Sequence, residues 1–438
     1  MLLNATADTT HDSENSDRTC RRRGRQDQPC QRQRRPRLLS AKALLLLPLL
    51  FISAVSGSPG PGAAPRMVEV ADGSSVWAGR IMAMDQATCC LMDRYGVMQR
   101  LPVSELRSFR VVAEKFRPAT AAEMREQLRQ EFPDGYEIAG STYYLVCAPR
   151  GKANAYRDLF DEIYRSVEKF YRVRGLPITA PDTVLTAVVF GSQQEFAEFC
   201  RRDEVAWSPG LRGYYSLRSN RIIMFDTSGP LLSPEKQDLP SRRGGAAPVR
   251  DKARDPDDHF RFPFPDSSGF SVAGQTSATI IHETTHQVGY NIGVHRRTGG
   301  TPAWLLEGLA TVLESPGVRS SSAGSNLQQR LNRERCDWFR SEYASRRRTG
   351  DVAALVASED MFRRNTLDAY SLSWAVSFFI TESPVRSRQL VRYMQRVESR
   401  PPGKEPTAEQ RLADFQDVFG DIVAFEVEFL RFVDRLEY

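Results

Sequence analysis

The stretch Ile281–Gln287, Ile-His-Glu-Thr-Thr-His-Gln, holds two of the five histidines of this 438-residue chain. On a helix, His282 and His286 are one turn apart and face the same way. Both imidazoles can then reach one Zn²⁺ at about 2.0–2.1 Å. Glu283 lies beside the pair, where it can address a metal-bound water without being a ligand. Taken alone, the stretch is also compatible with two solvated or buried histidines on a helix.

A second helix is predicted over Thr301–Glu314, because Thr301 is a good N-cap residue and Pro302 suits the first helical position. The loop at 290–300 can turn this helix back alongside the first. Glu307 would then complete a two-histidine, one-glutamate site with a fourth position left for water. Glu314 shares that face and is predicted to be a surface acid, with support of a histidine as the alternative.

The pattern His-Glu-x-x-His followed by Trp-Leu-x-Glu-Gly-x-Ala at 304–310 resembles the gluzincin metallopeptidases, specifically the peptidase-MA-like group of exported proteins. The resemblance covers roughly residues 136–395, with an insertion as a departure. It implies that His282, His286 and Glu307 bind zinc. It also implies that Glu283 is the general base for hydrolysis of a peptide bond.

Other residues near the motif are less decisive. In the thermolysin variant an aspartate four residues after the glutamate ligand supports a histidine, but Thr311 stands there in this chain. A tyrosine on a downstream helix often stabilises the oxyanion in the family, which makes Tyr370 the candidate; a packing aromatic with a solvated hydroxyl is the simpler interpretation. His295, beside Arg296 and Arg297, is predicted to lie in a solvated loop, with substrate contact as the alternative.

Upstream of the motif, strand and helix patterns alternate over 136–226, which predicts a small mixed sheet with covering helices. The run Arg221–Asp226 is either the sheet edge beside the zinc or an interior strand. At an edge, an extended peptide could add as a further strand. Short apolar runs between turns such as Asp72-Gly73 predict a small SH3-like β-barrel over 67–115. A Thr120–Glu123 capping box predicts a connecting helix after it.

The N-terminal region combines arginines, a short apolar run at Ala43–Val55 and then small residues, which is the layout of a secretory signal peptide. The run is short for a bilayer span, although an uncleaved anchor is the alternative. Both interpretations place the body of the protein outside the cytoplasm. The protein is thus expected to be periplasmic, at the cell surface or extracellular, with a membrane contact only through an uncleaved segment.

The distribution of charge and the cysteine content bear on the kind of partner and on the presence of disulfide bonds. Residues 1–56 carry nine arginines, Lys42 and five acids, so they account for +5 of the formal charge of +6 and the rest is near neutral. A nearly neutral body argues against a nucleic-acid partner. Five cysteines follow residue 56 and include the adjacent Cys89 and Cys90, which favours buried thiols with at most one or two bridges.

The predicted class is therefore α+β, with a gluzincin-like catalytic domain after the small barrel. The expected segments are a signal region at 1–56, a flexible linker at 57–66, the barrel at 67–115, a connecting helix at 116–135, an α/β subdomain at 136–226, a disordered insertion at 227–274, a helical zinc-binding subdomain at 275–398 and a C-terminal helical segment at 399–438.

The leading functional hypothesis is an exported zinc-dependent metallopeptidase acting on a peptide or protein substrate. One alternative is a non-catalytic surface binding module with structural zinc or none. Another is a zinc amidase that acts on cell-wall amides. The sequence leaves the peptide specificity, the role of the insertion and the oligomeric state open.

Overall fold

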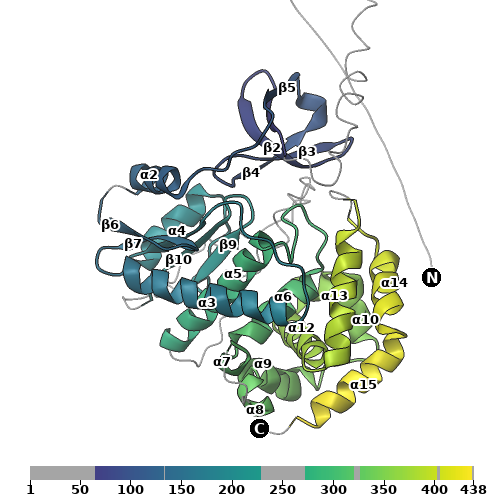
Figure 1. The fold of residues 1–438 in the computed structure, drawn as a ribbon. Helices are drawn as coiled ribbons and strands as arrows, with labels where there is room; N and C mark the ends of the chain where they lie inside the picture. The colour runs from purple at the N-terminus through teal and green to yellow at the C-terminus, as the bar shows by residue number, and fades with distance from the viewer. Residues whose placement is uncertain (1–64, 133, 228–271, 320–325, 402–404, 437–438) are drawn as a thin grey trace, which may run out of the picture. The chain divides into compact units, whose positions relative to one another are not determined.

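The computed structural model describes residues 65–132, 134–227, 272–319, 326–401 and 405–436. The predicted signal region at 1–56, most of the linker at 57–66 and nearly all of the insertion at 227–274 lie outside these residues. The described residues belong to one unit of the chain, Pro59–Tyr438. In this unit two small sheets are followed by a helical region, which confirms the α+β class (Figure 1).

The first sheet is antiparallel and has the order β4-β3-β2-β1-β5. Its elements are β1 (Met67–Ala71), β2 (Val76–Met84), β3 (Thr88–Met92), β4 (Met98–Pro102), the 3-10 helix η1 (Val103–Glu105) and β5 (Ser108–Ala113). The predicted turn at Asp72 is present. Its carboxylate accepts hydrogen bonds of 2.8 Å from the backbone N–H groups of Ser74 and Ser75, and Gly73 supplies the φ of 99° that follows.

The structure shows a five-stranded antiparallel sheet here, and the SH3-like barrel predicted for 67–115 stays a prediction. β4 and β5 form its two ends, and no strand pairing joins them among the described residues. Turns and alternation are local signals and identified the strands correctly. Closure depends on the tilt and stagger of all strands together, which no local pattern encodes. Val68, Val70, Cys89 and Leu91 form the core of the sheet on one face.

The second sheet is mixed, with the order β6-β7-β8-β10-β9. β7, β8 and β10 run parallel, whereas β6 and β9 pair antiparallel to their neighbours. The elements of this part are α2 (Ala121–Glu131), β6 (Tyr136–Gly140), β7 (Tyr144–Pro149), α3 (Ala153–Val173), β8 (Leu185–Phe190), α4 (Gln193–Arg202), β9 (Gly213–Ser216) and β10 (Arg221–Phe225). The predicted capping box opens α2, since Thr120 and Glu123 exchange side-chain-to-backbone hydrogen bonds.

Helices cover both faces of the second sheet because successive strand residues point to opposite sides. On β7, Tyr144 and Val146 pack with α3 and with α5 (Val272–Asn291). Leu145 and Cys147 pack on the other face, with α2 and α4. Figure 1 shows α3 running along the near face of this sheet. The metal-motif helix α5 is thereby held against a buried sheet face.

The run Arg221–Asp226 contributes an interior strand, because β10 lies between β8 and β9. The edge of the sheet on this side is β9, whose Tyr215 pairs with Ile222 of β10. Of the two alternatives for this run, the interior one is confirmed. The edge strand beside it is β9, which precedes β10 in the same hairpin.

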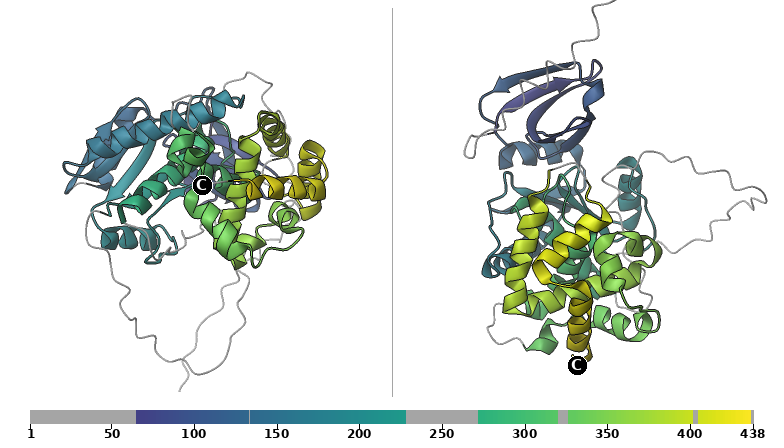
Figure 2. Two further views of the ribbon diagram at one scale, coloured as in Figure 1. Left: turned by 90° about the horizontal axis from the view of Figure 1, so that it is seen from below. Right: turned by 90° about the vertical axis from the view of Figure 1, so that its right-hand side faces the viewer.

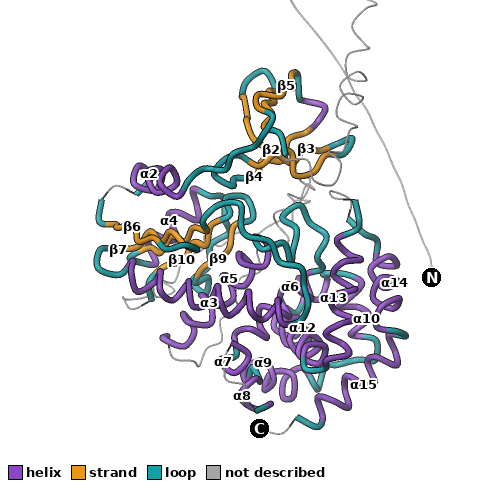
Figure 3. Tube along the Cα trace, viewed as in Figure 1, coloured by secondary structure: helices purple, strands orange, loops and turns teal. Residues whose placement is uncertain are grey.

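The region after α5 is helical (Figure 3). Its elements are α6 (Ala303–Glu314), α7 (Pro316–Arg319), α8 (Leu327–Arg330), α9 (Arg333–Trp338), the π-helix η3 (Phe339–Tyr343), α10 (Asp351–Ala357), α11 (Asp360–Arg364), α12 (Thr366–Thr381), α13 (Pro384–Glu398), α14 (Ala408–Phe419) and α15 (Ile422–Asp434). α12 is the centre of this region. It contacts α6, α9, α11, α13 and α15, and nearly all of its residues are buried.

A close approach between α6 and α12 depends on a glycine. A Cβ atom added at Gly308 would lie 2.1 Å from Oγ of Ser377 and 2.5 Å from the carbonyl oxygen of Ser373. Since real Cβ atoms do not approach other atoms so closely, only glycine allows the two helices this separation. Figure 2 shows the helices of this region from two further directions.

Two further predictions can be compared with the described residues. The five cysteines that follow residue 56 are all buried thiols, in agreement with the sequence. No helix in the described part of the chain is both long enough and apolar enough to traverse a bilayer.

Candidate metal centre

Helix α5 brings the two motif histidines together as their spacing predicts. The rings of His282 and His286 lie 4.7 Å apart, centroid to centroid, at an interplanar angle of 79°. Both side chains are buried. The helix around them is apolar on several sides, because Ile280, Ile281 and Val288 belong to the main hydrophobic core. The pair is therefore fixed by packing and is not a solvated surface feature.

Helix α6 supplies the predicted carboxylate. Oε2 of Glu307 lies 2.9 Å from Nε2 of His282, and Oε1 lies 3.5 Å from Nε2 of His286. α6 begins at Ala303, with Pro302 rather than the predicted Thr301 at the cap and no side-chain cap bond. Burial of Ala303–Leu313 by its neighbours sets the position of this helix instead. Glu307 is 4% exposed and faces the histidine pair.

These three residues form a donor set that fits a metal ion. One donor atom from each of His282, His286 and Glu307 lies within 4.8 Å of the other two. Two imidazoles and one carboxylate are the ligand set of many catalytic zinc sites, in which water takes the fourth position. Among the described histidine, cysteine and acidic residues, no fourth one joins this group. The donor chemistry thus matches an open site better than a closed structural one.

The charges in the site are balanced through His282. Burial alone would lower its pKa, but hydrogen bonds to Glu307 and Glu314 outweigh burial and raise the pKa of His282 to about 10. Burial likewise acts to raise the pKa of Glu307, yet the charge of His286 and the hydrogen bond from His282 hold it below its ordinary value. A buried carboxylate paired with a protonated imidazole is the arrangement that a divalent cation would replace.

Glu283 lies next to the donor set without being part of it. Its Oε2 accepts a hydrogen bond of 2.7 Å from the backbone N–H of Tyr215 on strand β9. Burial raises the pKa of the Glu283 carboxyl, although the neighbouring His282 and His286 act in the opposite direction. A carboxyl group whose pKa is raised above its ordinary value is suited to accept and return a proton.

Glu314 is not the surface acid that the sequence favours. Its Oε1 accepts a hydrogen bond of 2.8 Å from Nδ1 of His282, on the ring edge opposite Glu307. Its Oε2 accepts another, of 2.7 Å, from Nδ2 of Asn332. Asn332 is the N-cap residue of α9 and also donates to the carbonyl oxygen of Thr311. The physical reason is a contact with a distant residue: Asn332, at the start of α9, donates hydrogen bonds to the last turn of α6 and to Glu314 itself.

Thr311 has a different role from the aspartate of the thermolysin variant. Its hydroxyl donates to the carbonyl oxygens of Glu307 and Gly308 in its own helix. Support for His282 comes from Glu314 instead, seven residues after Glu307. Both positions face α5 because seven residues are close to two helical turns. Support of a histidine by Glu314 was the alternative left open by the sequence, but the residues around Glu314 did not distinguish it from a surface position.

Tyr370, on α12, is buried and lies close to the metal ligands. Its ring centroid lies 6.1 Å from that of His282. Burial raises the pKa of the Tyr370 phenol well above its ordinary value, and the charge of Glu307 and a hydrogen bond with that carboxylate add to the effect. The hydroxyl is therefore turned toward the donor set and is not a solvated group on a packing aromatic.

His295 does not join the site, and its loop is not solvated. Its side chain is 3% exposed, and its ring packs against those of Tyr171 and Tyr290. Burial, followed by the charge of His286, lowers the pKa of His295 to about 3. Arg297 turns inward as well and donates to the carbonyl oxygens of Leu217 and Arg218. The two arginines beside His295 suggested solvent, but one of them satisfies buried carbonyl groups.

A buried polar network that the sequence did not indicate joins α5 to the second sheet. Gln287 donates to the carbonyl oxygens of Thr186 and Asn220 and accepts from the hydroxyl of Tyr144. Asn220, at the β9–β10 turn with φ of 58°, also accepts from the hydroxyl of Tyr215. These contacts fix the residue after His286 to the hairpin that carries β9. No local motif marks them, because the partners are distant in sequence.

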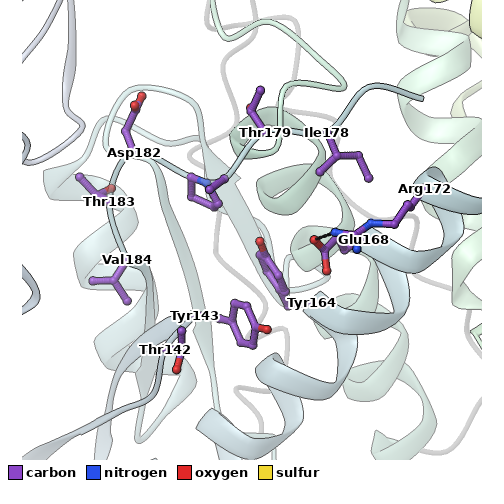
Figure 4. A pocket seen from close by; sticks show the side chains of 12 residues that line it. Thr142, Tyr143, Tyr164, Glu168, Arg172, Ile178, Thr179, Asp182, Thr183 and Val184 are labelled. Carbon is purple, nitrogen blue, oxygen red and sulfur yellow. Dashed lines mark hydrogen bonds and ion pairs between the residues drawn. The ribbon is translucent and has the colours of Figure 1, made fainter. Parts of the chain in front are cut away.

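A separate pocket of about 430 Å³ lies between α3 and the segment before β8. Figure 4 shows Tyr143 and Tyr164 on one side of it and the Glu168–Arg172 pair on another. The two tyrosine rings stack on each other at 4.3 Å, and Arg165 lies over the ring of Tyr143. None of the metal-donor residues lines this pocket.

Comparison with known proteins locates the donor set inside a recognised family segment. Residues 276–404 match the model of a family described as "Protein of unknown function (DUF1570)". No curated protein matches the chain. The matched segment includes the two histidines, Glu283, Glu307 and Tyr370, but the family description assigns them no activity.

Proposed function

We propose that the protein is an exported zinc-dependent metallopeptidase. The observation that carries the proposal is the convergence of His282, His286 and Glu307, from two helices, on donor positions within 4.8 Å of one another. The presence of Glu283 beside this set supports hydrolysis over a purely structural role. A structural metal site needs no such acid, and it usually has four protein ligands.

His282, His286 and Glu307 would hold the zinc ion. When bound, Zn²⁺ acts as a Lewis acid toward a carbonyl group and lowers the pKa of its water to about 7. The carboxylate of Glu314 would keep the ring of His282 in one orientation with Nε2 turned to the metal. Burial of the set excludes bulk water, which strengthens each of these electrostatic interactions.

Glu283 would serve as the general base. Its carboxylate takes a proton from the attacking water and later delivers it to the leaving amine. The hydrogen bond from the Tyr215 N–H holds one carboxylate oxygen, so the other is left to make the proton transfers. The hydroxyl of Tyr370, which is hydrogen-bonded with Glu307, would donate to the oxygen on which negative charge develops.

Strand β9 is the surface on which we expect the substrate backbone to lie. It is the edge strand of the second sheet, and its Tyr215 reaches Glu283 directly. An extended peptide can add to such an edge through main-chain hydrogen bonds, which gives binding with little side-chain specificity. This role moves from Arg221–Asp226, where the sequence suggested it, to Gly213–Ser216.

The decisive experiment compares wild-type protein with Glu283→Gln. The variant should keep stoichiometric zinc and lose hydrolysis of a mixed peptide library by about 10²-fold or more. Glu198→Gln, on the exposed face of α4, is a matched control that should keep full activity. Equal cleavage by wild type and Glu283→Gln would remove the assignment.

A substrate screen separates the peptidase from its alternatives. Cleavage of cell-wall fragments without cleavage of peptides would identify an amidase that uses the same residues. Zinc binding without hydrolysis of either class would indicate a binding module. Export is tested independently, by recovering the protein outside the cytoplasm and sequencing its new N-terminus; recovery only from the cytoplasm would reject it.

A further inference from the structure

A buried arginine close to the metal centre has no use in the mechanism above. Arg335, on α9, is 4% exposed. Its Nε atom is buried without a hydrogen-bond partner. Its one ion-pair contact in the described part of the chain is to Glu334, at 3.6 Å, and that side chain is 37% exposed. This is a weak neutralisation for a charge removed from water.

Such an arrangement is costly unless something else supplies a partner. A buried charge is stable in proteins when it is paired and hydrogen-bonded, because desolvation is otherwise uncompensated. Arg297, which is buried to a similar degree, meets this condition by donating to the carbonyl oxygens of Leu217 and Arg218. Arg335 makes no equivalent contact, so its donors remain available for an anion from outside the chain.

The position of Arg335 connects it to the candidate active site. Its guanidinium carbon lies 5.5 Å from the centroid of the Tyr370 ring. The same ring lies 6.1 Å from the ring of His282. The ring of Tyr370 therefore lies between the guanidinium of Arg335 and the metal-donor set. The carboxylate contact of this guanidinium, to Glu334 at 3.6 Å, is longer than a hydrogen bond.

The backbone of Arg335 is fixed on both sides. Its N–H donates to Oδ1 of Asn332, the residue that also holds Glu314. Its carbonyl oxygen accepts a hydrogen bond of 2.8 Å from the hydroxyl of Ser371, next to Tyr370 on α12. The side chain thus starts from an anchored point, which lowers the entropy lost when it orders around a ligand.

We propose that Arg335 binds a carboxylate of the substrate and so makes the enzyme selective for anionic peptides. This inference rests on the proposed peptidase function. A guanidinium binds a carboxylate through two parallel hydrogen bonds, which gives direction as well as charge. An extended peptide advances about 3.3–3.6 Å per residue, so a carboxylate within about two residues of the scissile bond is at a suitable distance. The carboxylate comes either from a free C-terminus or from an Asp or Glu side chain.

The test uses one cleavable peptide sequence in four forms. The C-terminus is either a free acid or an amide, and the residue near the scissile bond is either Glu or Gln. For wild-type protein, one carboxylate-bearing form should have a kcat/KM about ten- to hundredfold above its neutral counterpart, as expected for hydrogen bonds to a charged group. Which form gains identifies the source of the carboxylate.

Variants of Arg335 then show whether this residue is responsible. In Arg335→Gln the ratio between the anionic and neutral forms should fall to near one, and in Arg335→Lys part of the ratio should remain. Arg347→Gln is the matched control, because Arg347 also lies over an aromatic ring, but that ring is Phe339 and not Tyr370. A ratio that is unchanged in Arg335→Gln would show that Arg335 only packs against Tyr370, and would overturn the inference.

A binding measurement keeps this test separate from that of the peptidase function. Zinc-loaded Glu283→Gln is titrated with the free-acid and neutral peptides, with Arg335 intact and with Arg335→Lys, so that no result depends on turnover. Weaker binding of the neutral form by tenfold or more, reduced in the lysine variant, supports carboxylate recognition even if no peptide is cleaved. Equal binding of all forms rejects the inference while leaving the hydrolytic assignment to its own experiment.

Discussion

Glu314 and His282 are joined by a hydrogen bond of 2.8 Å that runs from the ring edge opposite Glu307. One imidazole is thus held between two carboxylates that belong to the same helix, α6. Glu307 is a candidate metal ligand, and Glu314 holds the imidazole ring in its orientation. Glu314 lies about one helical turn beyond Thr311, the position at which the thermolysin variant has its supporting aspartate.

We predict that Glu314→Gln weakens zinc binding by about 10- to 100-fold, the usual effect of losing an outer partner of a ligating histidine. The neutral amide removes the charge, and its own N–H groups would face those of Asn332. The zinc dissociation constant is measured by competition with a chelator. Glu428→Gln, which removes the exposed partner of Arg386, should leave the constant unchanged. A dissociation constant unaltered by Glu314→Gln would contradict the prediction.

Stability of the metal-free protein should fall as the pH rises. The pKa of His282 is raised from an ordinary value near 6.5 to about 10 by its two carboxylates, after burial is overcome. A raised pKa stabilises the folded state fully below pH 6.5, and this contribution is lost between pH 6.5 and about 10. Thermal unfolding of chelator-treated protein across this range measures the effect, and His282→Gln should flatten it.

Zinc binding should have the opposite pH dependence. Because the metal must displace the proton from His282, the apparent affinity should rise by up to about tenfold per pH unit below that pKa. Between pH 6.5 and about 10, the zinc-loaded protein should therefore become more stable relative to the metal-free protein as the pH rises. An apparent affinity independent of pH would show that His282 is already neutral in the metal-free protein.

Acid should destabilise the protein through His295. Its pKa is lowered from about 6.5 to about 3 by burial and by the charge of His286, so the folded state resists protonation. As the pH falls from 6.5 toward 3, the unfolded chain takes up a proton that the folded chain does not. The free energy of unfolding should therefore drop by at most about 1.4 kcal/mol per pH unit from this residue. His295→Gln should make the acid limb shallower by about one proton, measured by urea unfolding.

Gly308 should tolerate no side chain. The methyl group of Gly308→Ala would meet Oγ of Ser377 and the carbonyl oxygen of Ser373, so α6 and α12 must separate. We expect a loss of about 1–3 kcal/mol in stability, as for other overpacked cores, and weaker zinc binding because Glu307 moves with α6. Ser377→Ala alone is the control and should be nearly neutral. Adding it to Gly308→Ala should restore part of the loss; no change in stability for Gly308→Ala would contradict the packing argument.

The sequence predicted the donor set because each of its two helices is marked by signals between residues close together in the chain. The spacing of His282 and His286 within one helical turn is sufficient to place both rings on one face. Glu307 followed from a second helix with its own start and stop signals. Spacing alone could not decide Glu314, since its environment is created by Asn332, which lies beyond the end of that helix.

The remaining differences have the same origin in contacts between distant residues. The strands of the first sheet were visible as alternating runs, but the pairing of β1 with the distant β5 was not. The charge of Arg297 suggested solvent around His295. Its guanidinium instead donates hydrogen bonds to carbonyl oxygens in the β9–β10 turn. The link between Tyr215 and Glu283 had no sequence signal, because a backbone N–H has no side-chain identity.

That backbone link ties two tasks to one peptide unit. The Tyr215 N–H that holds Glu283 belongs to the edge strand on which we expect the substrate backbone to lie. The position of the proton acceptor is thus set by the same main chain that would align the peptide. A change in the backbone of β9 should therefore alter both the alignment of a peptide and the proton affinity of Glu283.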